Sequence, residues 1–122
     1  MFDFLKRRKA QIILEHADNF DLRNNFYMIG RATIDENKFL KRKKWFVLVG
    51  LKIAIIDNIM SSSISRKHGE FIWNDNTYCY KDVGSSCGSK INGIPLRPGQ
   101  EYLLKSGDKI LLGGVLELVY II

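Results

Sequence analysis

Short apolar runs, separated by closely spaced turn signals, constrain the fold of this chain more than any other feature. The runs are rich in Ile, Val, Tyr, Phe and Trp, as in "GEFIW", "TYCYKDV" and "LELVYII", which is typical of β-strands. After residue 70, turn signals such as "NDN", "GSSCG", "RPG" and "SGD" recur about every ten residues. This spacing predicts an all-β sandwich or barrel.

Alternation within the runs predicts which side chains share a face of each strand. Successive side chains of a strand point to opposite sides. In "EFIW", Phe71 and Trp73 therefore share one face, and in "YCYKD", Tyr78, Tyr80 and Asp82 do the same. The C-terminal run is apolar enough that we expect it to be paired and covered, as an integral part of a sheet.

Length and composition indicate one soluble domain. A chain of 122 residues is the size of one domain with one core. The net charge of +6 favours an anionic partner, which charge alone leaves open among nucleic acid, a membrane surface and a phosphorylated protein. The most apolar run, at 45–56, carries Lys52 and is too short to cross a bilayer. We therefore expect a cytoplasmic protein.

The titratable residues do not suggest catalysis or metal binding. Cys79 and Cys87 lack the spacing of a metal site, and no second pair completes one. We expect two reduced thiols, no metal and no cofactor. Because no acid–base pair or activated nucleophile is visible, we expect a binding protein rather than an enzyme.

Four short motifs stand in a fixed order. "FYMIGR" ends at Gly30-Arg31, "ISRKH" holds Ser65, Arg66 and His68, "DVGSSCGSKING" spans 82–93, and "LLKSGDKILLGG" spans 103–114. Together they resemble the forkhead-associated (FHA) domain, a module that binds phosphothreonine peptides. The resemblance covers about residues 10–122. It implies a β-sandwich of two mostly antiparallel sheets, of the FHA/SMAD type.

These residue types also suit a phosphate on chemical grounds. A phosphothreonine carries about −1.5 to −2 charges and three acceptor oxygens. Arg31 follows an apolar strand, where its guanidinium can bind a phosphate in a forked geometry. Ser65 offers a hydroxyl donor and Arg66 a second cation. None of these groups is a nucleophile paired with a base, so the motif predicts recognition.

The resemblance implies a role for each matching position. Arg31 and Ser65 would contact the phosphate directly, with Arg66 and Ser86 adding further phosphate contacts. Cys87 and Ser89 would contact the peptide. The positions expected to support the binding loops are Gly30, His68, Asn92 and Gly93.

The chain departs from the family pattern at two places. Cys87 stands where the family has an asparagine that binds the peptide backbone, and a thiol donates only weakly. We expect a several-fold loss of affinity or a different ligand geometry. The 33 residues between Arg31 and Ser65 exceed the family pattern. We place the insertion at about 33–50 and expect an added hairpin, bent at "LVGLK", next to the binding end.

The predicted organisation is a basic N-terminal segment over 1–9 and one FHA-like domain over 10–122. The leading interpretation is a signalling or assembly adaptor that recognises phosphothreonine in a partner protein. The alternatives are a sandwich that binds nucleic acid or another anion, and a degenerate domain that binds an unphosphorylated partner. A nucleic-acid site needs a continuous basic track with exposed aromatics, so it is less favoured. The basic N-terminus is compatible with weak contact with an anionic membrane surface.

Overall fold

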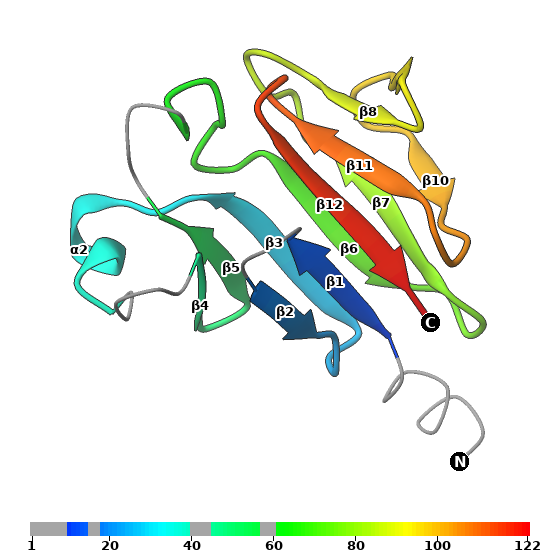
Figure 1. Cartoon of the computed structure of the whole chain (residues 1–122), viewed down its shortest axis with the longest axis horizontal. Helices are drawn as coiled ribbons and strands as arrows, with labels where there is room; N and C mark the ends of the chain where they lie inside the picture. Colours follow the sequence, from blue (N-terminus) through cyan, green and yellow to red (C-terminus); the bar gives the residue numbers. More distant parts are fainter. Residues whose placement is uncertain (1–9, 15–17, 40–44, 57–60) are drawn as a thin grey trace.

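The computed structural model describes residues 10–14, 18–39, 45–56 and 61–122. Two six-stranded sheets pack face to face (Figure 1). From edge to edge, the first sheet contains β2 (Asp18–Asp21), β1 (Gln11–Leu14), β12 (Leu116–Ile121), β11 (Lys109–Leu112), β8 (Ser89–Ile91) and β9 (Ile94–Pro95). The second contains β10 (Glu101–Leu103), β7 (Tyr78–Asp82), β6 (Gly69–Trp73), β3 (Phe26–Arg31), β5 (Lys52–Ile55) and β4 (Phe46–Val49).

Strand pairing is antiparallel throughout, apart from the parallel pair of β3 and β5. The predicted all-β sandwich of two mostly antiparallel sheets is therefore confirmed. Among the described residues, no helical segment combines the length and the hydropathy needed to cross a bilayer.

The core lies between the two sheets, as the alternation predicts. Phe71 and Trp73 of β6 and Tyr78 and Tyr80 of β7 are buried. Their rings pack edge to face, with centroids 5.3 Å apart for Phe71 and Tyr80 and 5.1 Å apart for Trp73 and Tyr78. β12 is paired with β1 on one side and β11 on the other, so the C-terminal strand is integral to its sheet.

The segment 33–50 contains a one-turn helix and the first strand of a hairpin. The helix, α2 (Ile34–Asn37), begins at Thr33, which forms a capping box with Glu36. β4 and β5 form the hairpin, whose turn contains Gly50 at φ +62°. In the parallel pair of β3 and β5, Lys52 lies level with Met28 and Ile55 with Arg31.

The placement expected for the bend is therefore wrong. Lys52 lies level with Met28 and the turn at Gly50 precedes it, so the turn lies toward the Phe26 end of β3 and away from Arg31. The basic runs at 6–9 and 41–44 fall within the segments 1–9 and 40–44, which lie outside the described residues.

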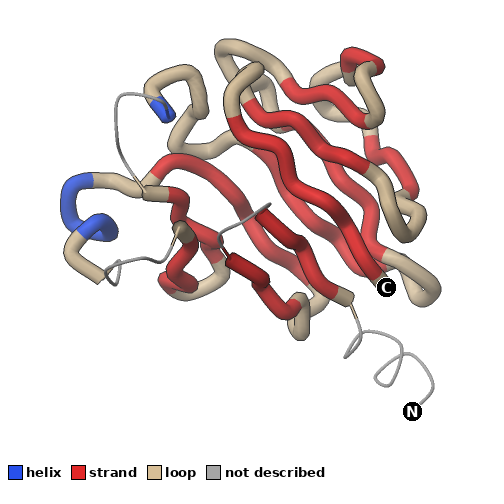
Figure 2. The backbone as a smooth tube through the Cα atoms, viewed as in Figure 1, coloured by secondary structure: helices blue, strands red, loops and turns tan. Residues whose placement is uncertain are grey.

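The loops at one end of the sandwich hold most of the candidate site residues. The loop before β6, the loop between β7 and β8 and the turn between β11 and β12 gather there, in the upper part of Figure 1. Figure 2 shows them as tan segments that connect the ends of the red strands. A rigid pair of sheets thus positions three loops that are far apart in sequence.

Candidate functional site

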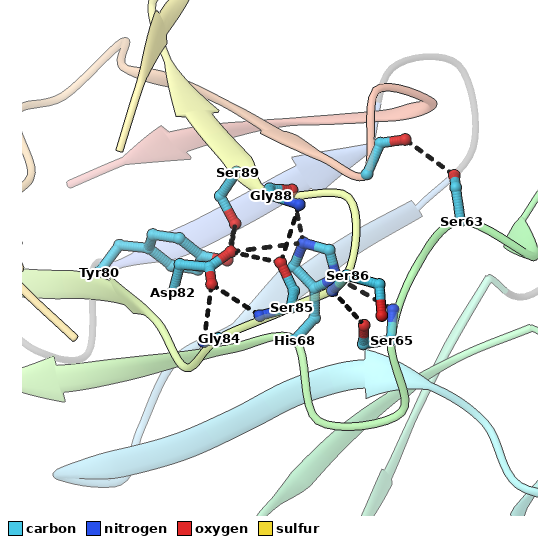
Figure 3. Close-up of polar contacts among 11 residues, drawn as sticks. Ser63, Ser65, His68, Tyr80, Asp82, Gly84, Ser85, Ser86, Gly88 and Ser89 are labelled. Atoms are coloured by element: carbon cyan, nitrogen blue, oxygen red, sulfur yellow. Dashed lines mark hydrogen bonds and ion pairs between the residues drawn. The ribbon is translucent and has the colours of Figure 1, made fainter. Parts of the chain in front are cut away.

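Ser65 connects two of these loops. Its backbone carbonyl accepts a hydrogen bond from the backbone N–H of Arg31 at 3.0 Å, which ties the loop to the end of β3. Its side-chain Oγ accepts a hydrogen bond from the backbone N–H of Ser86 at 3.0 Å (Figure 3). The structure therefore brings Arg31, Ser65 and Ser86 together, although they lie on three separate segments.

His68 is the second connection between the same loops. The fully buried imidazole accepts the backbone N–H of Ser65 at Nδ1, at 3.0 Å. Because Nδ1 is the acceptor, the ring proton lies on Nε2, which donates to the carbonyl oxygen of Gly88 at 2.9 Å. Burial lowers the pKa of His68, against the opposing effects of the Gly88 carbonyl and the Asp82 carboxylate. The imidazole is neutral, and its contacts fit the supporting role expected from the sequence.

Asp82 fixes the loop that follows β7. Its Oδ1 accepts the backbone N–H groups of Gly84 and Ser85, each at 2.9 Å. Its Oδ2 accepts the hydroxyls of Ser85 and Ser89, each at 2.6 Å. Burial raises the pKa of Asp82, but these hydrogen bonds outweigh burial and lower it overall. The carboxylate is therefore ionised, and its hydrogen bonds connect Gly84, Ser85 and Ser89 to the end of β7.

The structure corrects the role that the sequence analysis assigned to Ser89. We expected it to contact the peptide, but its side chain is buried at 4% exposure. Its hydroxyl donates to Asp82, so Tyr80 must donate its own hydroxyl to Ser89 Oγ, at 2.8 Å. Burial raises the pKa of Tyr80. As the first residue of β8, Ser89 points inward and completes this internal network.

Gly30 supports the site because its lack of a side chain lets the backbone of Ser65 and Arg66 lie close to β3. A Cβ at Gly30 would overlap the backbone carbonyls of Ser65 and Arg66. Arg31 is then held at its side chain as well, because its Nε–H donates to the carbonyl of Ile64 at 3.1 Å. Any other residue at position 30 would push the Ser65 loop away from Arg31.

The other predicted site residues divide into two groups. Arg66, Ser86 and Cys87 are exposed on the two loops beside Ser65, and Cys87 carries a free thiol. Asn92 and Gly93, at φ +52° and +81°, form the turn between β8 and β9. The Asn92 amide donates to Asp108 at 2.9 Å, so this turn supports the loop before β11. It lies at the far end of β8 from Ser89, and the structure does not bring it to the loops of Ser65 and Ser86.

Sequence reasoning missed a third loop at the site. The Ser63 hydroxyl donates to the carbonyl of Gly113 at 2.8 Å, and the Gly113 N–H donates to the carbonyl of Gly88 at 2.9 Å. Gly113 has φ +59°, so the double glycine in "LLGG" was the available signal. Ser63 lies in a run of three serines whose pattern does not distinguish its role.

This end of the molecule brings together the Ser65 hydroxyl and the side chains of Arg31 and Arg66. Hydroxyl and guanidinium groups are chemically suited to hydrogen bonding with an anion. Within the described part of the chain, no group of three or more His, Cys, Asp or Glu side chains is arranged to hold a metal ion.

Comparisons with known proteins agree with this geometry. The model of the FHA domain matches residues 27–113. The protein FraH of Nostoc sp. (strain PCC 7120) is 42% identical over 53 residues, which cover 43% of this chain and 18% of FraH. The chain thus matches less than a fifth of the length of that relative.

Solved structures share the fold at low sequence identity. The FHA domain of an Arabidopsis thaliana hypothetical protein superimposes with a TM-score of 0.69 and 22% identity, covering 93% of this chain and 85% of that one. Mycobacterium tuberculosis EmbR, solved in complex with a low-affinity phosphopeptide, gives a TM-score of 0.68 and 18% identity, covering 96% of this chain and 27% of EmbR. With the family model spanning most of the chain, the protein belongs to the FHA domain family, whose members are non-catalytic modules known for binding phosphothreonine peptides.

Proposed function

We propose that this chain binds phosphothreonine in a partner protein and acts as a signalling or assembly adaptor. The observation that carries the proposal is the hydrogen bonding of the Ser65 hydroxyl. Its oxygen already accepts the backbone N–H of Ser86, so its orientation is set before any ligand arrives. A hydroxyl has one donor hydrogen. Within the described residues no hydrogen bond uses that of Ser65, so it is left for a phosphate oxygen.

The charges beside Ser65 complete the proposed phosphate site. Arg31 reaches the site from the end of β3, and the exposed Arg66 follows Ser65 directly. A phosphothreonine brings about −1.5 to −2 charges, and hydrogen bonds between ionised partners are about twice as strong as neutral ones. Because the Arg31 Nε–H is fixed to the Ile64 carbonyl, the guanidinium loses little further freedom on binding.

The proposed peptide contact lies one residue beyond Ser86. Cys87 is exposed on the loop that Asp82 and His68 hold in place. An extended peptide bound through its phosphate at Ser65 would pass this side chain. The thiol gives it a weaker hydrogen bond than an amide would.

A peptide-library pull-down tests the proposed function. The wild-type chain is incubated with a degenerate phosphothreonine library and with matched phosphoserine and unphosphorylated libraries. We expect enrichment from the phosphothreonine library alone, and we expect Arg31→Ala, in a protein that remains folded by circular dichroism, to reduce it strongly. Equal recovery from the unphosphorylated library would contradict the proposal and favour a degenerate domain.

A further inference from the structure

Lys52 connects the strand that carries Arg31 to the helix of the inserted segment. The Lys52 ammonium donates to the backbone carbonyl of Arg31 at 3.0 Å. It also donates to Oε1 of Glu36 at 2.7 Å. Lys52 is the first residue of β5, so its side chain extends along the sheet from the level of Met28 to the end of β3.

Glu36 is itself held in place by the cap of α2. Its Oε1 also accepts the backbone N–H of Thr33 at 2.9 Å, and its own N–H donates to Thr33 Oγ1 at 3.1 Å. The side chains of Lys52 and Glu36 are only 14% and 18% exposed. Such a partly buried ion pair is screened less by water and salt than a surface pair. Burial raises the pKa of Glu36, but the bonds from Lys52 and Thr33 outweigh it and lower that pKa.

Arg31 is therefore held from both sides of β3. The Ser65 and Ile64 carbonyls accept its backbone N–H and its Nε–H, and Lys52 binds its carbonyl. We propose that Lys52 and Glu36 are positioning residues of the phosphate site. They fix the end of β3 that presents Arg31, and they couple α2 to ligand binding. This inference rests on the proposed role of Arg31.

Positioning by Lys52 and Glu36 matters because a forked contact between the Arg31 guanidinium and a phosphate requires precise geometry. Binding groups must be held within about 0.5 Å of their productive positions. Removing the Lys52 ammonium takes a donor from the Arg31 carbonyl and leaves the Glu36 carboxylate without its cation. The end of β3 then keeps the backbone hydrogen bonds of Arg31 to Ser65 and of Ala32 to Ile55, but it loses its side-chain connection to α2.

A ligand-independent measurement tests the connection itself. Lys52→Met removes the ammonium, and Lys81→Met is the matched control. Lys81 pairs with Glu70 at 3.1 Å on the same sheet, with exposures of 27% and 18%, and joins β7 to β6. We expect Lys52→Met, but not Lys81→Met, to accelerate amide hydrogen exchange at Arg31 and Ala32. Unchanged exchange at both residues overturns the inference.

Binding then tests the positioning role. With the phosphothreonine peptide that the library selects, Lys52→Met should weaken binding about fivefold. In an Arg31→Ala background the same change should add nothing, because the two residues act through one contact. Full additivity, or an equal loss in Lys81→Met, overturns the positioning role. If Lys52→Met does not fold, Glu36→Gln keeps the side-chain size and tests the same connection, with a smaller loss expected.

A failure of the proposed function can be distinguished from a failure of the inference about Lys52 and Glu36. If the wild-type chain binds no phosphothreonine peptide, the proposed function fails. The exchange rates at Arg31 and Ala32 still decide whether Lys52 and Glu36 hold the end of β3.

Discussion

The backbone N–H of Ser65 donates to Nδ1 of the buried His68 at 3.0 Å, so one neutral imidazole sets the loop that presents the proposed phosphate-binding hydroxyl. The other ring nitrogen reaches the Gly88 carbonyl in the neighbouring loop. Loop geometry at the candidate site therefore depends in part on one fully buried side chain.

Loss of His68 should reduce stability. His68→Ala removes two hydrogen bonds from a fully buried position and leaves the Ser65 N–H and the Gly88 carbonyl with fewer partners. A buried polar group left unsatisfied costs about 1–3 kcal/mol. We expect a lower melting temperature by differential scanning calorimetry. A variant with unchanged stability that no longer binds phosphopeptide would instead make His68 a direct ligand contact.

Stability should fall as the pH drops below about 6.5. The pKa of His68 in the folded protein is below its ordinary value of 6.5, chiefly because of burial. Between these two values the unfolded chain binds more protons, so the free energy of unfolding decreases as the pH falls and is fully restored above 6.5. Urea denaturation at several pH values measures this slope. His68→Gln should flatten it, and an equal slope in the variant would assign the effect to other groups.

Loss of the two proposed phosphate contacts, Arg31 and Ser65, should weaken binding by different amounts. Arg31→Ala should weaken phosphothreonine-peptide binding most, because it removes a charge-assisted contact. Ser65→Ala should cost about 1.5–3 kcal/mol, the range for one hydrogen bond to a charged group. Isothermal titration calorimetry measures both.

The chain also offers matched controls for Arg31→Ala and Ser65→Ala. Ser62 and Arg97 are exposed, so Ser62→Ala and Arg97→Ala should bind like the wild-type chain. Wild-type affinity in both site variants, with the fold intact, would show that the phosphate binds elsewhere.

Cys87→Asn should strengthen peptide binding. The exposed side chain lies in the loop beside Ser86, and an amide supplies a stronger donor and acceptor than the thiol. One added hydrogen bond contributes about 0.5–1.5 kcal/mol, seen mainly as slower dissociation in surface plasmon resonance. The gain should require the phosphate. An equal gain with the unphosphorylated peptide would place Cys87 outside the proposed peptide path.

The sequence predicted the sandwich and much of the candidate site, for identifiable reasons. Alternation places Phe71 and Tyr80 in the core, and the order of the motifs places Arg31 and Ser65 together. The inward orientation of Ser89 depends on where β8 begins, which the motif does not define. The contact of Lys52 with Arg31 joins residues 21 positions apart across a parallel pair, and no local pattern reports such pairing.

The carbonyl oxygen of Gly88 accepts both the His68 ring and the Gly113 N–H, each at 2.9 Å. This shared acceptor is a main-chain atom, so no side-chain substitution at position 88 can delete it. A Cβ there would meet nothing within 4 Å, and Gly88→Ala would add only backbone strain at φ +78°. An alanine scan would thus overlook the atom on which three loops meet. Weakening the acceptor itself, by an amide-to-ester exchange between residues 88 and 89, would expose it.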